Sequence, residues 1–239
     1  MTAATKLDFT TPVVTGDTRP RWEERLLARA AADNHEQFVE RSRQIVAAAY
    51  DLLEEDGLEG LTIRAVLAKT GLARRAFYER FAGKDDLVLA VFEQTVRLAA
   101  SHYGAMLAAI PDPVEQLHML VSCIAMGASS LDAEQSTFSS RRGAALSREH
   151  LRLAESRPDE LQAALSPLVM LFAQVLADGM TAGRIRQHAP QRLAALIYNL
   201  VSTTVITELV GQVDSEADRN RHAELANDIW DFCWRAVAA

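Results

Sequence analysis

Two adjacent arginines, Arg74 and Arg75, stand in a short segment that also carries aromatic residues at helical spacing. Phe77 and Phe81 are four positions apart, so on a helix both would face the protein interior. Arg74, Arg75 and Tyr78 would then lie on the solvent-facing side. A short helix that is anchored by two aromatic rings and exposes adjacent arginines is suited to insertion into a DNA major groove.

The segment just before it predicts a second helix that would hold the first in place. Its residues recur at the spacing of a helix with one buried face: Ile63, Val66, Leu67 and Thr70. Thr62 precedes this run and is suited to cap the helix N-terminus. Gly71 follows it and permits the sharp connection that two steeply crossing helices need, so the pattern predicts a helix-turn-helix.

Positive charge is concentrated in this region. Between positions 61 and 84 only Glu79 is negative, against six positive residues: Arg64, Lys69, Arg74, Arg75, Arg80 and Lys84. The whole chain, in contrast, carries a formal net charge of −7. Because phosphate neutralisation dominates non-specific DNA affinity, we expect an acidic body that binds DNA only through this one basic surface.

The order and spacing of several residues resemble the signature of TetR-type transcriptional regulators. They are Thr62, Gly71-Leu72, Phe77-Tyr78, Phe81 and Lys84-Asp85-Asp86-Leu87. The resemblance, which covers about a fifth of the chain, implies a homodimeric DNA-binding regulator, most often a repressor, with a palindromic operator and an effector-binding body. Ala73 and Ala76 depart from the family pattern, which usually has hydroxyl-bearing residues there, so a helix cap must come from elsewhere.

Motif and resemblance together give a predicted set of DNA contacts: Arg43, Thr62, Arg64, Arg74, Arg75, Ala76, Tyr78 and Lys84. Arg43 could equally belong to a solvated helix face. The resemblance implies that Lys84 binds a phosphate, the alternative being a solvent-exposed lysine. The ring of Tyr78 could be part of the core while its hydroxyl reaches a phosphate, because ring and tip are chemically separate.

Composition and periodicity predict an all-α fold with three parts. Residues 37–86 form a three-helix DNA-binding domain, residues 87–239 form a helical effector-binding and dimerisation domain, and residues 1–36 form a partly mobile extension. Within the extension, Arg21–Ala32 is a candidate helix. It could dock on the body through Trp22 and Leu26, or Arg19 and Arg21 could enter a DNA minor groove.

The body predicts a linking helix from Leu87 to Ala109 and further helical segments. These are Pro113–Leu131, Ser147–Ala154, Pro158–Leu165, Pro167–Gly179, Pro190–Gly211 and Ser215–Ala238, with a loop at Asp132–Ala144. The last two helices carry broad apolar stripes and are predicted to form a homodimer. Dimerisation would place two DNA-reading heads about one helical turn (~34 Å) apart; the alternative is that both stripes belong to an ordinary monomer core.

A small hydrophobic effector is expected to bind the body, where flexible and aromatic residues collect. The candidates are Tyr103, Met106, Leu107, Met119, Cys123, Met126, Phe138, Met170, Phe172 and Tyr198. Methionine adapts to irregular apolar shapes, although such a stripe can equally be core. Ligand binding would release the DNA if the ligand preferred the other conformation.

Motifs for other chemistry are missing from the sequence. We find no nucleophile elbow, phosphate-binding loop, dinucleotide fingerprint or zinc-protease motif, and the six histidines show no ligand spacing. No catalytic residue, cofactor or metal is therefore expected. Without a signal peptide or an apolar run of about 18 residues, a cytoplasmic protein with no membrane contact is predicted. An all-helical small-molecule carrier and an unrecognised helical enzyme remain the alternatives.

Overall fold

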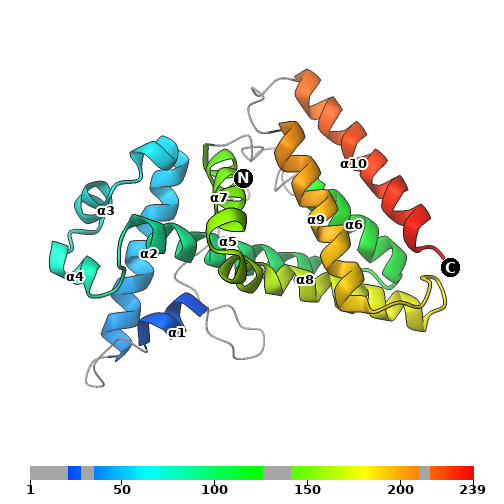
Figure 1. Cartoon of the computed structure of the whole chain (residues 1–239), viewed down its shortest axis with the longest axis horizontal. Coiled ribbons are helices and arrows are strands. Elements are labelled where there is room, and N and C mark those ends of the chain that lie inside the picture. The colour runs from blue at the N-terminus through cyan, green and yellow to red at the C-terminus, as the bar shows by residue number, and fades with distance from the viewer. Residues whose placement is uncertain (1–20, 28–34, 126–140, 210–215) are drawn as a thin grey trace.

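The computed structural model describes residues 21–27, 35–125, 141–209 and 216–239, and these residues form an elongated all-helical molecule (Figure 1). A small head containing α2, α3 and α4 lies at one end, and a larger body at the other. The helices are α1 (Arg21–Leu27), α2 (His35–Gly60), α3 (Ile63–Thr70), α4 (Arg74–Tyr78), α5 (Lys84–Leu107), α6 (Pro113–Ala125), α7 (Arg141–Ser156), α8 (Pro158–Thr181), α9 (Pro190–Leu209) and α10 (Glu216–Val237). The predicted all-α class is confirmed.

Local signals fix the helices of the head where the sequence placed them. Gly57 has a positive φ (69°) and kinks the end of α2, as expected for a glycine at a helix terminus. The Thr62 hydroxyl accepts a hydrogen bond from the backbone N–H of Ala65 at 3.1 Å, so the predicted N-cap of α3 is confirmed. Gly71 ends α3 as a C-cap residue with left-handed backbone angles (φ 69°, ψ 10°), and α4 follows after a short turn.

Helix α5 connects the head to the body. It packs against α2 of the head and against α8, α6 and α7, while α9 packs on α8 and α6. Apolar residues along α5 are buried almost continuously from Leu87 to Phe92, because head and body helices cover it from several sides. The predicted linking helix is therefore present, beginning at Lys84 and ending at Leu107.

Two expectations about the body were wrong in detail. Residues 158–181 form one helix, α8, although Pro167 stands inside it and predicted a break. A proline removes one helical hydrogen bond, and packing of α8 against α5, α6 and α9 holds the helix together across that site. The predicted loop at Asp132–Ala144 is helical from Arg141, where α7 begins; residues 126–140 lie outside the described residues.

Helix α8 is also long and apolar enough, by length and composition, to cross a membrane. The expectation that no stretch reaches this threshold was therefore wrong. Half of the apolar window is buried within the protein, and buried core helices of globular proteins pass the same test. Since α8 packs on α5, α6 and α9, we treat it as the central helix of the body.

The end of the chain is fastened to the turn after α8. Ile185 forms an isolated antiparallel bridge with Ala238, and the backbone N–H of Arg186 donates to the carbonyl of Val237 at 2.9 Å. The Arg186 guanidinium also donates to the carbonyl of Ala236. A cation at this position is favourable for the negative end of α10. The contacts between residues 185–186 and 236–238 therefore hold the end of α10 in place.

Candidate nucleic-acid interface

Helix α4 is held from beneath by two phenyl rings. Phe77 and Phe81 are both buried, with ring centroids 5.6 Å apart. The ring of Tyr78 meets Phe77 edge-on at 5.4 Å, although Tyr78 itself is exposed. A five-residue helix cannot be stable by itself, so this anchoring decides where α4 lies.

The outer face of α4 presents the two arginines predicted from the sequence. The Arg75 side chain is 90% exposed, and its Nε donates to Glu79 Oε1 at 2.8 Å. The Arg74 guanidinium lies over the Tyr78 ring at 5.5 Å from its centroid. Exposed ion pairs of this kind contribute about 0–1 kcal/mol, so DNA can displace Glu79 from Arg75 at small cost.

Arg80 belongs to the interior and does not contribute to the basic surface. Its side chain is 4% exposed; Nη1 donates to the carbonyl of Ala76 at 2.6 Å, and the guanidinium lies 4.3 Å from the centroid of the Phe38 ring. Burial lowers the pKa of the Arg80 guanidinium. The expectation that Arg80 belongs to the basic surface was therefore wrong. Its spacing from Phe77, three positions along the same helical face, was the available signal.

Two lysines of the charged segment are also engaged within the protein. Lys69 Nζ lies 2.6 Å from Glu55 Oε1 and 3.7 Å from Asp51, both on α2. These carboxylates raise the pKa of Lys69. Lys84 Nζ donates to the carbonyl of Leu58 at 2.6 Å, an arrangement that neither sequence alternative included. Because Arg80 is buried and Lys69 and Lys84 contact α2, the positive surface available to DNA consists of three exposed residues. They are Arg64, Arg74 and Arg75.

Among the other predicted contacts, Thr62 is exposed at the N-terminus of α3 and Ala76 is partly exposed on α4. Arg43 lies elsewhere: its Nε and Nη2 donate to the two carboxylate oxygens of Glu23 at 2.8 and 3.3 Å. Because its guanidinium is engaged with α1, Arg43 is left out of the contact set that we propose below. Ala73 starts α4 with extended backbone and no side-chain cap, as its missing hydroxyl predicted.

Five of the predicted effector residues are buried in the body: Tyr103, Leu107, Cys123, Phe172 and Tyr198. Tyr103, Cys123 and Tyr198 come from α5, α6 and α9, and lie close enough that the latter two contribute to raising the Tyr103 pKa, after burial as the main cause. Burial also raises the pKa of Tyr198. Both phenols are therefore neutral near pH 7 and can donate hydrogen bonds.

The remaining predicted effector residues fall into three groups. Met106 and Met119 pack partly buried against the core. Met170 is 67% exposed on α8 and does not line the interior, so including it was wrong. Met126 and Phe138 lie outside the described residues.

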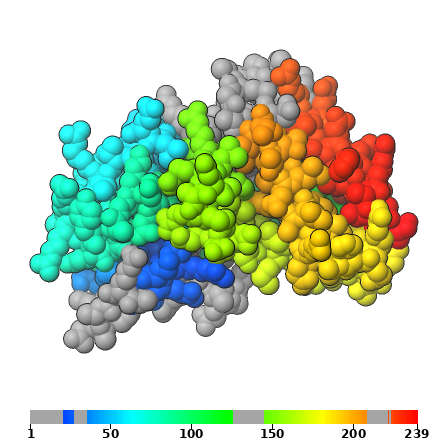
Figure 2. Space-filling view, viewed as in Figure 1, coloured from blue at the N-terminus to red at the C-terminus, as the bar shows by residue number. Residues whose placement is uncertain are grey.

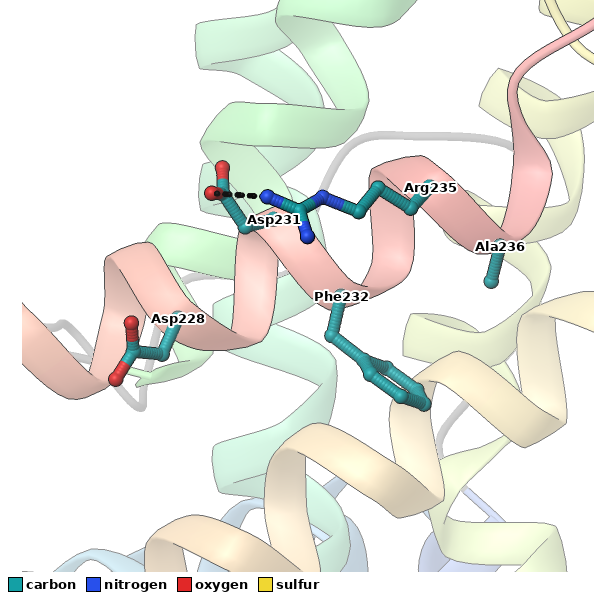
Figure 3. Close-up of a pocket in the computed structure, with 5 residues that line it drawn as sticks. All are labelled: Asp228, Asp231, Phe232, Arg235 and Ala236. Atoms are coloured by element: carbon teal, nitrogen blue, oxygen red, sulfur yellow. Dashed lines mark ion pairs between the residues drawn. The ribbon is translucent and has the colours of Figure 1, made fainter.

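A surface groove is present on α10, and none of the predicted effector residues lines it. Asp228, Asp231, Phe232, Arg235 and Ala236 line it. Phe232 projects away from the Asp231–Arg235 pair, whose charged atoms are 3.5 Å apart (Figure 3). The main apolar feature of this groove is therefore the exposed aromatic ring of Phe232.

Residues 45–91 match the model of the family described as bacterial regulatory proteins, tetR family. That range begins within α2, includes α3 and α4, and ends in the first half of α5. The chain carries a TetR-type DNA-binding head. The helix-turn-helix predicted from the residues is thus confirmed as that of the TetR family.

Solved structures share the fold over most of this chain. A TetR-family transcriptional regulator from Pectobacterium atrosepticum is 18% identical with a TM-score of 0.67, covering 85% of this chain and 96% of that one. RolR in complex with resorcinol is 13% identical with a TM-score of 0.64, covering 84% and 89%. FadR from Bacillus subtilis in complex with stearoyl-CoA is 16% identical with a TM-score of 0.57, covering 80% and 96%. No curated protein sequence matches the chain.

Proposed function

We propose that this protein is a DNA-binding transcriptional regulator, a repressor that leaves a palindromic operator when a small hydrophobic molecule enters its body. The single observation that supports this most is the TetR-type head, whose α4 exposes Arg74 and Arg75 while Phe77 and Phe81 fix it from beneath. An acidic chain with a formal net charge of −7 favours contact through this one surface.

The proposed DNA contacts are Thr62, Arg64, Arg74, Arg75, Ala76, Tyr78 and Lys84. Arg75 is the candidate for base readout, because its side chain is 90% exposed and a guanidinium can donate two hydrogen bonds to guanine. Arg64 on α3 and Arg74 are suited to phosphates. Lys84 would have to exchange the Leu58 carbonyl for a phosphate, so it is a secondary contact.

Selection of bound sequences from a random duplex pool tests this function. We expect a two-fold-related sequence with half-sites about one helical turn apart. Arg75→Ala should relax discrimination at one base-pair position and lower the binding free energy for the preferred sequence by about 1–3 kcal/mol. Arg64→Ala should lower the affinity for all sequences alike. Glu155→Gln, an exposed change on α7, is the control. Retention of no sequence above background would refute the proposal.

The homodimer is proposed to form through α9 and α10. Leu196 and Leu200 are one turn apart on α9 and are 57% and 37% exposed, and Phe232 on α10 is 63% exposed beside the surface groove. Exposed large apolar side chains on two consecutive helices favour a protein interface there. Ile197 and Val201, on the other side of α9, are buried in the body.

Sedimentation velocity tests this interface. Leu196→Glu and Phe232→Glu should each yield monomers, because a carboxylate in an apolar contact cannot be desolvated cheaply. Met170→Glu introduces the same charge at an equally exposed apolar residue outside α9 and α10, and should leave the dimer intact. Dimers in all three variants would exclude this surface.

The effector is proposed to bind between α5, α6 and α9, near Tyr103, Cys123 and Tyr198. Two neutral phenols in an apolar surrounding favour a hydrophobic, uncharged molecule that can accept hydrogen bonds. RolR, which shares the fold, is solved with resorcinol, an uncharged phenol and therefore a suitable first probe. FadR is solved with stearoyl-CoA, whose charged coenzyme A part makes it a second probe that tests the preference for uncharged molecules.

Thermal shift in the presence of each probe, followed by operator release, tests this proposal. Tyr103→Phe and Tyr198→Phe each remove one hydroxyl and should lower the affinity for any probe that binds. Met170→Ala is the control at an exposed site. A carrier would bind the probe without affinity for duplex DNA, and an enzyme would convert it. We place the regulator in the cytoplasm, where its DNA is.

A further inference from the structure

Helix α1, outside the region that matches the TetR family, lies at the junction of head and body (Figure 2). Trp22 and Leu26 are buried there, so the predicted docking of this helix on the body through these two residues is confirmed. Its polar side chains are also engaged, and they contact two different helices. Glu23, itself buried, accepts hydrogen bonds from Arg43 of α2 at 2.8 and 3.3 Å.

The other contacts of α1 are made to α5. Trp22 Nε1 donates to Gln94 Oε1 at 3.4 Å, and Arg25 Nη1 donates to Glu93 Oε1 at 2.8 Å. Glu93 is 5% exposed, and its second oxygen, Oε2, has no hydrogen-bond partner within the described part of the chain. Burial raises the pKa of Glu93 and Arg25 opposes that shift. Without α1, an uncompensated carboxylate and an unpaired amide would remain on α5.

The contacts of α1 include charge pairs, which burial of an apolar helix face does not require. Trp22 and Leu26 alone would cover the apolar surface of the junction, whereas Glu23 and Arg25 add hydrogen-bonded charge pairs. Buried charge pairs add little net stability, yet they have directional geometry and are costly to break on one side only. A seven-residue helix that joins α2 to α5 through such pairs therefore favours one orientation of the two helices.

A second brace holds the same junction. Arg152 of α7 lies 3.5 Å from Asp85, and Arg157 lies 3.7 Å from Asp86, both acceptors being in the first turn of α5. In Figure 1, α7 is above the junction and α1 below it. Helix α2 also packs directly against α7 and α5. Loss of the α1 contacts would remove one of the braces of the junction, and we expect the head then to rotate more widely about the start of α5.

We propose that α1 is a strap and that Trp22, Glu23 and Arg25 are positioning residues, which set the orientation of the DNA-reading head relative to the body. They would act through α2 and α5 without touching DNA. The role in DNA binding depends on the function proposed above, whereas the effect on head orientation does not. The experiment measures the two separately.

Head orientation is measured by single-molecule energy transfer within one chain. Dyes are attached at Ala68→Cys on α3 and Ala182→Cys just after α8, two exposed positions, and labelled chains are mixed with excess unlabelled protein. Cys123 and Cys233 are buried and should label slowly. The strap variants are Trp22→Ala and Arg25→Ala; the matched control is Arg21→Ala, an exposed arginine on the same helix.

We expect one narrow distance distribution for the parent and the control, and a broadened or shifted one for both strap variants. Identical distributions in all four proteins would overturn the proposal. The double variant Arg25→Ala/Glu93→Gln removes the stranded charge as well as the pair. It should recover melting temperature relative to Arg25→Ala and still show the broad distribution; a return to the narrow distribution would assign the effect to charge burial alone.

Operator affinity is then measured for the same proteins. A head that is correctly oriented about a tenth of the time binds about tenfold more weakly, so we expect losses of that order in the strap variants and none in Arg21→Ala. Unchanged affinity despite broadened distances would overturn the positioning role. If the parent protein does not bind an operator but the strap variants still change the distance between the dyes, the proposed function is refuted. The role of α1 in head orientation is then still supported.

Discussion

The two helices of the helix-turn-helix are fixed by different means. Helix α3 has a complete local frame, with the Thr62 side chain at its N-terminus and left-handed Gly71 at its C-terminus. Helix α4 has no side-chain cap at Ala73 and spans five residues. Its position comes from contacts beneath it, where Phe77 and Phe81 are buried and Arg80 donates to the Ala76 carbonyl.

This difference matters for DNA recognition. Local capping specifies where a helix begins and ends, and it depends on neighbouring residues only. Anchoring by buried side chains specifies where a helix lies relative to the rest of the head, which is what a reading helix requires. The helix that presents Arg74 and Arg75 is therefore the one whose position depends on tertiary contacts.

Truncating the aromatic anchor should have the largest effect. Phe77→Ala removes a fully buried ring and is expected to destabilise the protein by about 3–5 kcal/mol in chemical denaturation. Hydrogen exchange in residues 62–82 should accelerate. The control is Tyr78→Ala, an exposed neighbour, expected to cost about 1 kcal/mol or less. Equal costs for both would contradict the anchoring role.

Replacing the buried arginine should have the next largest effect. Arg80→Met keeps much of the apolar stem but removes the hydrogen bond to the Ala76 carbonyl, at about 1–3 kcal/mol. Operator affinity should fall while its salt dependence stays unchanged, because Arg80 meets no phosphate. Arg74→Ala, in contrast, should reduce the salt slope by about 1. A reduced slope in Arg80→Met would mean that Arg80 does reach DNA.

Removing the cap of α3 should cost less. Thr62→Ala deletes the acceptor for the Ala65 N–H and is expected to destabilise by about 1 kcal/mol. Thr62→Ser keeps the acceptor and should behave like the parent in denaturation. If serine were as destabilising as alanine, the lost methyl group and not the cap would explain the effect.

Adding a cap to α4 should have the smallest effect and the opposite sign. Ala73 has the extended backbone of an N-cap (φ −70°, ψ 149°), so Ala73→Ser should stabilise the head by about 0.5–1 kcal/mol. Ala68→Ser, at an exposed interior position of α3, is the control and should not stabilise. No gain from Ala73→Ser would indicate that tertiary contacts already satisfy the start of α4.

Much of the head could be predicted from the sequence because its signals are local. Thr62, Gly71 and the spacing of Phe77 and Phe81 act within a few residues of one another, and the structure follows them. The break at Pro167 failed as a prediction because packing of α8 on three neighbouring helices outweighed a local preference.

Charge was the property that sequence alone assigned least well. Six positive residues between positions 61 and 84 determined that this segment is basic, and their types determined what they can bind. Only the tertiary structure decided that Arg80 is buried and that Lys69 and Lys84 already have partners on α2. The partners of a long charged side chain come from distant parts of the chain, so spacing cannot reveal them.

The same reason applies to the junction of head and body. The sequence determined that Trp22 and Leu26 form an apolar face on a short helix, and the structure buries both. Only the tertiary structure brought Arg25 to Glu93, which is 68 residues away, and Glu23 to Arg43. Local sequence fixes helices and their caps, whereas the geometry between helices arises from side chains that meet only after the chain has folded.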